Sequence, residues 1–130
     1  MESLIVLSKV KKYIKEKSGF STSGSFFDPL NKDVQDALKN AIDHTKKSDR
    51  KTVMGRDFNF YLDKPEINEI LVVASKIKNY VKSESELSTS KQCMEQLTVR
   101  VQKICDLAID NATNAKRKTV MDKDFTSLQL

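Results

Sequence analysis

Glycine and proline are scarce in this chain, which has three glycines and two prolines among 130 residues. An all-β sandwich or barrel needs turn residues at short, regular intervals, and this composition does not supply them. A few long helices joined by short loops need far fewer turn residues. With 38% apolar and 32% charged residues, the composition is typical of a folded domain rather than of a disordered chain. We therefore expect an all-α fold.

Long apolar runs and metal-binding patterns are missing as well. The longest purely apolar runs, Leu4 to Leu7 and Ile70 to Ala74, are far shorter than the ~20 residues that cross a bilayer. The first residues do not form a basic leader segment, so we expect a soluble, intracellular protein. Cys93 and Cys105 lie twelve positions apart, and the chain has one histidine. Neither a zinc site nor a disulfide framework is therefore expected, and no cofactor is expected.

Positive charge is present in modest excess. The chain has 23 Lys and Arg residues against 18 Asp and Glu residues, which gives a net charge of +5. The excess is shared, because residues 1–63 carry +3 and residues 64–130 carry +2. A weak preference for an anionic partner is all that this charge alone indicates.

The sequence repeats itself. An offset of 67 residues aligns Leu4–Phe58 with Leu71–Phe125 without a gap, and 24 of these 55 pairs are identical. Self-similarity at a fixed period indicates a duplicated unit. The segment between the copies is too short and too apolar for a flexible tether between independent domains. We therefore expect the copies to pack on each other.

Each copy has the pattern of a short helix, a long helix and a second short helix. In the first helix, Val6, Val10 and Ile14 recur at helical spacing, and the lysines between them belong to another face. The long helix of the second copy carries apolar residues at steps of three and four from Cys93 to Ala112. Such a stripe is too long to be buried within a unit of about 55 residues, because small units bury little surface alone.

The last helix of each copy is predicted to be brief. It begins near Met54 or Met121, includes Phe58 or Phe125, and ends before Pro65 or at the chain terminus. We expect residues 1–63 to form the first unit and residues 64–130 the second, and the two together to form one compact domain.

A basic loop followed by an acidic residue is the strongest local signal. Arg50-Lys51-Thr52-Val53 precedes Asp57 by the same spacing as Arg117-Lys118-Thr119-Val120 precedes Asp124. The β-branched pair favours a short extended stretch, and the acid is favoured in the first turn of a following helix. An arginine fork bound to that carboxylate would hold the loop in shape. The neighbouring lysine and threonine would stay free for an anion. We therefore expect two structural clamps, formed by Arg50 with Asp57 and by Arg117 with Asp124.

These loops, together with the helix order and the duplication, resemble two histone folds in one chain. The pattern is similar to that of tandem, pseudodimeric histones of archaeal and bacterial type, and it covers nearly the whole chain. The resemblance implies a handshake in which the two long helices cross antiparallel. The loop at Ser21–Ser23 would then lie beside residues 117–120, and the loop at Ser88–Ser90 beside residues 50–53.

The resemblance also implies a function. Histones bind double-stranded DNA without reading its sequence, and they bend or compact it through phosphate contacts. By resemblance the contacts come from the two basic loops, the two Ser-Thr-Ser loops and the lysines of the first helices. These residues are Arg50, Lys51, Thr52, Arg117, Lys118, Thr119, Ser21, Thr22, Ser23, Ser88, Thr89, Ser90, Lys9, Lys11, Lys12, Lys15, Lys76, Lys78 and Lys82. The implied protein is a monomeric pseudodimer, able to form higher oligomers on DNA, in the cytoplasm and on the nucleoid.

The sequence departs from the histone pattern in three respects. Neither Ser-Thr-Ser loop offers the arginine that commonly enters the minor groove, and the first helices carry only lysines where an arginine is common. Pro29 aligns with Gln96, which lies well inside the second long helix. A proline there would break a backbone hydrogen bond. We therefore expect the first long helix to start or kink at Asp28-Pro29, which is a good pair for a helix start.

Other readings of the chain stay open. A histone-fold module that binds protein in a transcription or chromosome assembly, with little DNA binding of its own, is the alternative function. An enzyme is not expected, because no nucleophile and base stand in a recognisable pattern. Cys93 and Cys105 align with Phe26 and Leu38 and are predicted core residues. His44 is predicted to be a surface polar residue, and Tyr13 and Tyr80 to be core or interface aromatics.

Overall fold

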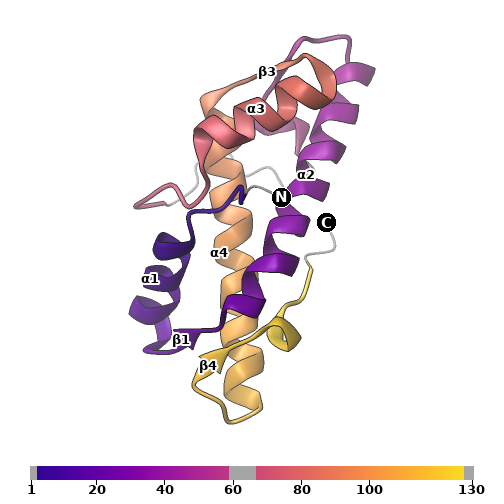
Figure 1. Ribbon diagram of the computed structural model, residues 1–130. Coiled ribbons are helices and arrows are strands. Elements are labelled where there is room, and N and C mark those ends of the chain that lie inside the picture. The colour runs from indigo at the N-terminus through magenta and orange to yellow at the C-terminus, as the bar shows by residue number, and fades with distance from the viewer. Residues whose placement is uncertain (1–2, 59–66, 128–130) are drawn as a thin grey trace.

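Two long antiparallel helices form the centre of the molecule (Figure 1). The structure is a computed structural model that describes residues 3–58 and 67–127. The long helices are α2 (Phe27–Lys47) and α4 (Lys91–Asn114), and each follows a shorter helix, α1 (Leu7–Ser18) or α3 (Ala74–Ser85). The described part of the chain contains no helix with the length and apolar character needed to span a membrane.

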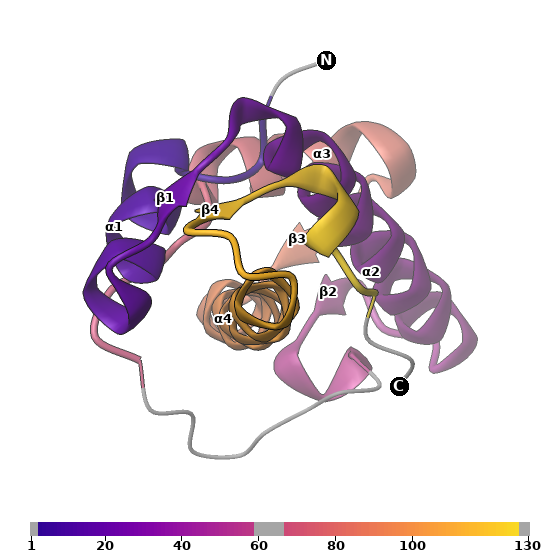
Figure 2. The same cartoon turned by 90° about the horizontal axis from the view of Figure 1, so that it is seen from below.

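Two pairs of very short parallel strands lie at opposite ends of the long helices (Figures 1 and 2). Strand β1 (Ser21–Thr22) pairs with β4 (Thr119–Val120), and β2 (Thr52–Val53) pairs with β3 (Ser88–Thr89). Each pair joins a loop from one half of the chain to a loop from the other. The predicted proximity of these loops is therefore confirmed.

The short helices pack across the two halves. Helix α1 contacts α4, and helix α3 contacts α2, so each short helix covers the long helix of the other half. Val10 and Ile14 of α1 are buried in the same core as their counterparts Ile77 and Val81 of α3. The apolar stripes of α2 and α4 face this shared core, which explains why neither half buries its own stripe alone.

The predicted third helix of each unit is wrong over the described residues. A single 3₁₀ turn stands in its place, η2 (Gly55–Asp57) or η3 (Asp122–Asp124). The next residue in each unit, Phe58 or Phe125, has extended backbone. The Phe58 side chain is buried and Phe125 packs against the core, so burial of the ring draws the chain out of the helical path. Positions 59–66 and 128–130, which the predicted helices also included, lie outside the described residues.

Helix α2 begins slightly earlier than expected. The α-helix starts at Phe27 after a 3₁₀ turn, η1 (Gly24–Phe26), whose first turn is capped by the Ser23 hydroxyl. Asp28 is therefore inside the first turn and is not the N-cap. Pro29 is the third helical residue, where its missing N–H costs nothing because the first four N–H groups of a helix have no partner within it.

Residues at equivalent positions of the sequence repeat meet in pairs near the centre of the molecule. Ile5 and Val72, which are 67 positions apart, form an isolated antiparallel bridge. Asp33 of α2 and Arg100 of α4 are also 67 positions apart, and they form a buried ion pair with Arg100 Nε 2.5 Å from Asp33 Oδ1. In a symmetric dimer of identical subunits, a residue on the twofold axis would meet the same residue of the other subunit. Duplication in one chain allows the two positions to carry opposite charges.

Asp33→Ala is expected to lower the free energy of unfolding by roughly 3–5 kcal/mol, because it leaves the buried guanidinium of Arg100 without its carboxylate. Asp33→Leu combined with Arg100→Met is expected to stay close to the wild type, because an apolar pair of similar volume removes both buried charges. Urea unfolding followed by circular dichroism measures both values. A double variant as unstable as Asp33→Ala would show that shape rather than charge governs this position.

Candidate nucleic-acid interface

The two strand pairs present the predicted basic loops in the same geometry. At the first end, Ser21 N–H donates to Lys118 O at 3.0 Å. At the other end, Ser88 N–H donates to Lys51 O at the same distance. The lysine that carries each carbonyl is exposed, as is the serine opposite it. Backbone pairing therefore places an ammonium group and a hydroxyl group together on the surface at each end.

An arginine clamp holds each basic loop, as the spacing predicted. Arg117 donates through Nη1 and Nη2 to the two carboxylate oxygens of Asp124, both at 2.6 Å, and through Nη1 to Thr119 O at 3.1 Å. Arg50 binds both oxygens of Asp57 in the same bidentate manner. Such fork-on-fork pairs fix orientation as well as charge. The arginines therefore shape the loops, and the adjacent lysines carry the available charge.

The carboxylates of both clamps have pKa values below the usual range. Burial by itself raises the pKa of Asp57, but hydrogen bonds from Arg50, the Met54 N–H, His44 and Thr45 outweigh it and lower the pKa. These hydrogen bonds stabilise the ionised form of the Asp57 carboxylate. The carboxylate also caps η2, because Met54 N–H donates to its Oδ2 at 2.7 Å.

Asp124 has the same role in the other half, with fewer hydrogen bonds lowering its pKa. The hydrogen bond from Arg117 is the largest influence and lowers the pKa of Asp124 against the opposing effect of burial. In the first clamp, His44 Nδ1 lies 2.8 Å from Asp57 Oδ1. The equivalent residue in the second half is Asn111, which donates to the Asp124 backbone carbonyl at 2.9 Å. His44 is exposed, as predicted, and it supports the first clamp from the α2 side.

The structure distinguishes between the hydroxyl groups of the two Ser-Thr-Ser loops. Ser21 and Ser88 are exposed. The Ser23 hydroxyl is occupied by Ser25, and the Ser90 hydroxyl lies 3.8 Å from Cys93 Sγ. The Thr22 hydroxyl oxygen is buried without a partner among the described residues, so it is out of reach of a phosphate. Thr52, Thr119 and Thr89 are half-buried in the strands.

The starts of the two short helices lie side by side between the two ends. Val6 N–H donates to Leu71 O at 2.8 Å, and Val73 N–H donates to Leu4 O at 2.9 Å. Val6 and Val73 are the N-cap residues of α1 and α3, and neither cap uses a side chain. Two helix N-termini, neither with a side-chain cap, therefore lie close together near the centre of the molecule, an arrangement that attracts anions.

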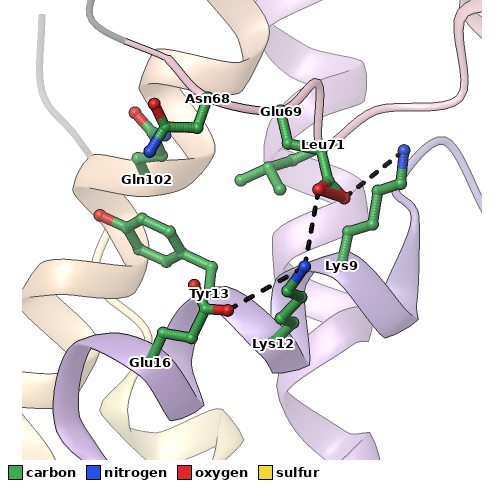
Figure 3. A pocket seen from close by; sticks show the side chains of 8 residues that line it. All are labelled: Lys9, Lys12, Tyr13, Glu16, Asn68, Glu69, Leu71 and Gln102. Carbon is green, nitrogen blue, oxygen red and sulfur yellow. Dashed lines mark ion pairs between the residues drawn. The ribbon is translucent and has the colours of Figure 1, made fainter.

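Some predicted lysines near this centre already have carboxylate partners. Lys9 Nζ lies 3.6 Å from Glu69 Oε1, and Lys12 Nζ lies 4.0 Å from both Glu69 Oε2 and Glu16 Oε1. Figure 3 shows these groups around a small polar pocket, where Tyr13 lies beside them. Glu69 therefore neutralises part of the α1 charge, a contact that the spacing of the sequence does not reveal.

The other first-helix lysines differ in their surroundings. Lys11 lies over the Phe27 ring, with Nζ 5.9 Å from its centroid. Lys82 donates to the Glu86 backbone carbonyl at 3.3 Å. Lys15 and Lys78 are exposed and Lys76 is half-buried, and none of these three forms an ion pair with another described residue.

The cysteines and tyrosines occupy the positions expected of them. Cys93 and Cys105 are free and buried, and burial raises the pKa of both thiols. Tyr13 and Tyr80 pack against the core, and the Tyr13 hydroxyl donates to Asp106 Oδ1 at 2.8 Å. Within residues 3–58 and 67–127, no group of three or more His, Cys, Asp or Glu side chains is placed to hold a metal ion.

Comparison with solved structures identifies the fold. The chain is similar to the histone from Methanopyrus kandleri, with a TM-score of 0.69 over 92% of this chain and 89% of that chain, at 14% sequence identity. No family model matches the chain, and no curated protein matches its sequence. The structural likeness shows that the chain has a histone fold.

Acidification is expected to weaken the protein through the two clamps. Because the folded-state pKa values of Asp57 and Asp124 are lowered, their stabilisation is present above the unfolded value of about 4 and is lost as the pH falls toward the folded values. Asp57→Asn with Asp124→Asn removes these titrating groups. We expect this variant to lose less unfolding free energy than the wild type between pH 5 and pH 2.

Urea unfolding at several pH values measures this loss, and Asp110→Asn serves as a control that removes an exposed carboxylate. Identical pH dependence in the clamp variant and the wild type would contradict the role assigned to the clamps.

Proposed function

We propose that this chain is a histone-like architectural protein, built from two histone folds that form an intramolecular pseudodimer, and that it bends or compacts double-stranded DNA. One observation carries the proposal: each end of the long helices presents an exposed lysine beside a clamped arginine, on a backbone pairing that is the same at both ends. Paired helix N-termini lie between these ends.

The chemistry of these three places suits phosphate groups. Lys51 and Lys118 supply charge, Ser21 and Ser88 supply hydroxyl donors, and the starts of α1 and α3 supply backbone N–H groups with the positive end of the helix dipole. All of these groups recognise the DNA backbone and carry no information about base sequence. A duplex that touches both ends and the middle of one rigid body must follow the surface that joins them, so binding and bending are coupled.

The proposed role is binding and not catalysis. The protein is proposed to work as a monomeric pseudodimer on the nucleoid in the cytoplasm, and to form higher oligomers when several copies occupy one duplex.

A second candidate is a module that binds protein. Its support is a groove between α1 and α2 with largely apolar walls, lined by residues that include Leu7, Lys11 and Phe27. Leu7 is 40% exposed. A gel-shift titration with random-sequence duplex at low micromolar protein distinguishes the two candidates, because the absence of a shift favours the module.

The DNA-binding proposal predicts a steep salt dependence, because each neutralised phosphate releases counterions. Lys51→Ala with Lys118→Ala is expected to lower the slope of log affinity against log salt concentration by up to about 2, or about 1 for each lost contact. Fluorescence anisotropy with a random-sequence duplex between about 50 and 200 mM salt measures this slope.

Lys39→Ala with Lys103→Ala is the matched control, since it removes two exposed lysines from the long helices outside the proposed contacts. Equal slopes for the two double variants would refute the loop mechanism.

Glu69→Gln is expected to tighten DNA binding, because it releases Lys9 and Lys12 from a competing carboxylate. A surface ion pair is weak, so the gain is roughly twofold to fivefold. The same anisotropy titration measures it. Glu84→Gln, an exposed carboxylate on α3, controls for the general change in net charge. If both variants gain equally, Glu69 has no specific effect on these lysines.

A further inference from the structure

The two ends of the molecule have matching backbone conformations but different side-chain charges. Beside each strand pair, two residues adopt a left-handed conformation and turn the chain from helix to strand. At the β1–β4 end these are Gly19 (φ 77°) and Lys116 (φ 61°). At the β2–β3 end the equivalent residues are Glu86 (φ 63°) and Asp49 (φ 57°).

The hydrogen bonds of these corners are closely matched. Gly19 N–H donates to Lys15 O at 2.7 Å and Glu86 N–H donates to Lys82 O at 2.8 Å. Asp49 N–H donates to Lys46 O at 3.0 Å, and Lys116 N–H donates to Thr113 O at 2.9 Å. All four corner residues are exposed. The two ends therefore differ in side-chain charge and not in local fold.

The charge difference is large for such small loops. Residues 19–23 and 116–120 contain three basic residues and no acidic ones, a net charge of +3. The equivalent residues 86–90 and 49–53 contain two basic and two acidic residues, a net charge of zero. Neither Asp49 nor Glu86 forms an ion pair with another described residue, so both carboxylates remain available to repel a phosphate near Lys51.

Charges next to these loops reduce the difference but do not lie in the corners themselves. Lys91 directly follows Ser90 and is exposed, where its counterpart is the uncharged Gly24. Lys82 donates to the Glu86 backbone carbonyl, and its counterpart Lys15 has the same charge. Lys47 is paired with Asp43 at 3.0 Å and, with Arg56, lines a pocket on the α2–η2 side. Lys46 belongs to the last turn of α2, before the corner. Asp122, at the other end, accepts hydrogen bonds from the Ser25 hydroxyl and the Lys123 N–H. Because salt screens exposed charges over about 8–10 Å, the corner charges beside the strands act most directly on a bound phosphate.

We propose that the protein binds DNA with a fixed polarity. The β1–β4 end is the anchor, and the β2–β3 end is a weak contact from which the duplex detaches first. This inference rests on the proposed function and adds that the two pseudo-equivalent phosphate sites have different affinities. Asp49 and Lys116 determine the difference, with Glu86 acting in the same direction as Asp49.

The duplication supplies matched variants for the test. Lys118→Ala and Lys51→Ala remove the same residue from the two ends. Asp49→Lys combined with Lys116→Asp exchanges the corner charges while the net charge stays the same. Both exchanged side chains enter a backbone conformation that the other already adopts. Anisotropy titrations with a random-sequence duplex at about 100 mM salt compare each lysine variant in the wild type and in the charge-exchanged protein, with circular dichroism to confirm folding.

In the wild type, Lys118→Ala is expected to weaken binding at least threefold more than Lys51→Ala. In the charge-exchanged protein the order is expected to reverse, so that Lys51→Ala becomes the more damaging change. Glu86→Gln alone is expected to tighten binding and to increase the loss caused by Lys51→Ala.

Three results separate the two proposals. If the wild type does not shift the duplex at all, the proposed function fails. If the wild type binds and the two lysine variants lose equal affinity, DNA binding stands and the polarity is wrong. If the variants differ but the charge exchange does not reverse their order, the difference arises elsewhere and the role of Asp49 and Lys116 is refuted.

Discussion

The mutual burial of two long helices is the constraint on which the rest of this structure depends. Helices α2 and α4 each carry an apolar stripe that no single half of the chain can cover, so the halves interleave, with α1 on α4 and α3 on α2. This exchange brings the loops of the two halves together as parallel strand pairs at both ends. Every surface feature proposed to contact DNA therefore follows from how the core is closed.

The clamps convert this arrangement into a defined surface. Each arginine is held by a buried carboxylate, and that carboxylate also caps the following 3₁₀ turn. Because the arginine is committed to the fold, the lysine beside it is left on the surface with a fixed backbone. At the centre, by contrast, Glu69 reduces the charge that α1 offers. The same chain thus contains groups that favour an anion and groups that oppose it, and their placement differs between the halves.

Duplication within one chain made that difference possible. Asp33 and Arg100, which are 67 positions apart, meet in the core, and two identical chains could not place opposite charges at equivalent positions in this way. The same freedom gives Asp49 where the other half has Lys116. Both differences can be read from the sequence, since the repeat alignment matches Asp33 with Arg100 and Asp49 with Lys116. What the alignment alone does not reveal is that the first pair is in contact across the core and that the second pair occupies opposite ends.

The repeat, the helical periodicity and the Arg-to-Asp spacing by themselves determined the fold class, the two long helices and both clamps, because each depends on local chemistry or on a pattern that persists along the chain. Tertiary structure decided the rest. Over the described residues, a single 3₁₀ turn stands at the start of each predicted third helix, and Phe58 and Phe125 follow it in extended conformation because burial of Phe58 and packing of Phe125 outweigh the weak propensity of a short helix. Glu69 reaches Lys9 and Lys12 only because packing folds a distant segment beside α1, and such contacts depend on the closed core rather than on spacing along the chain.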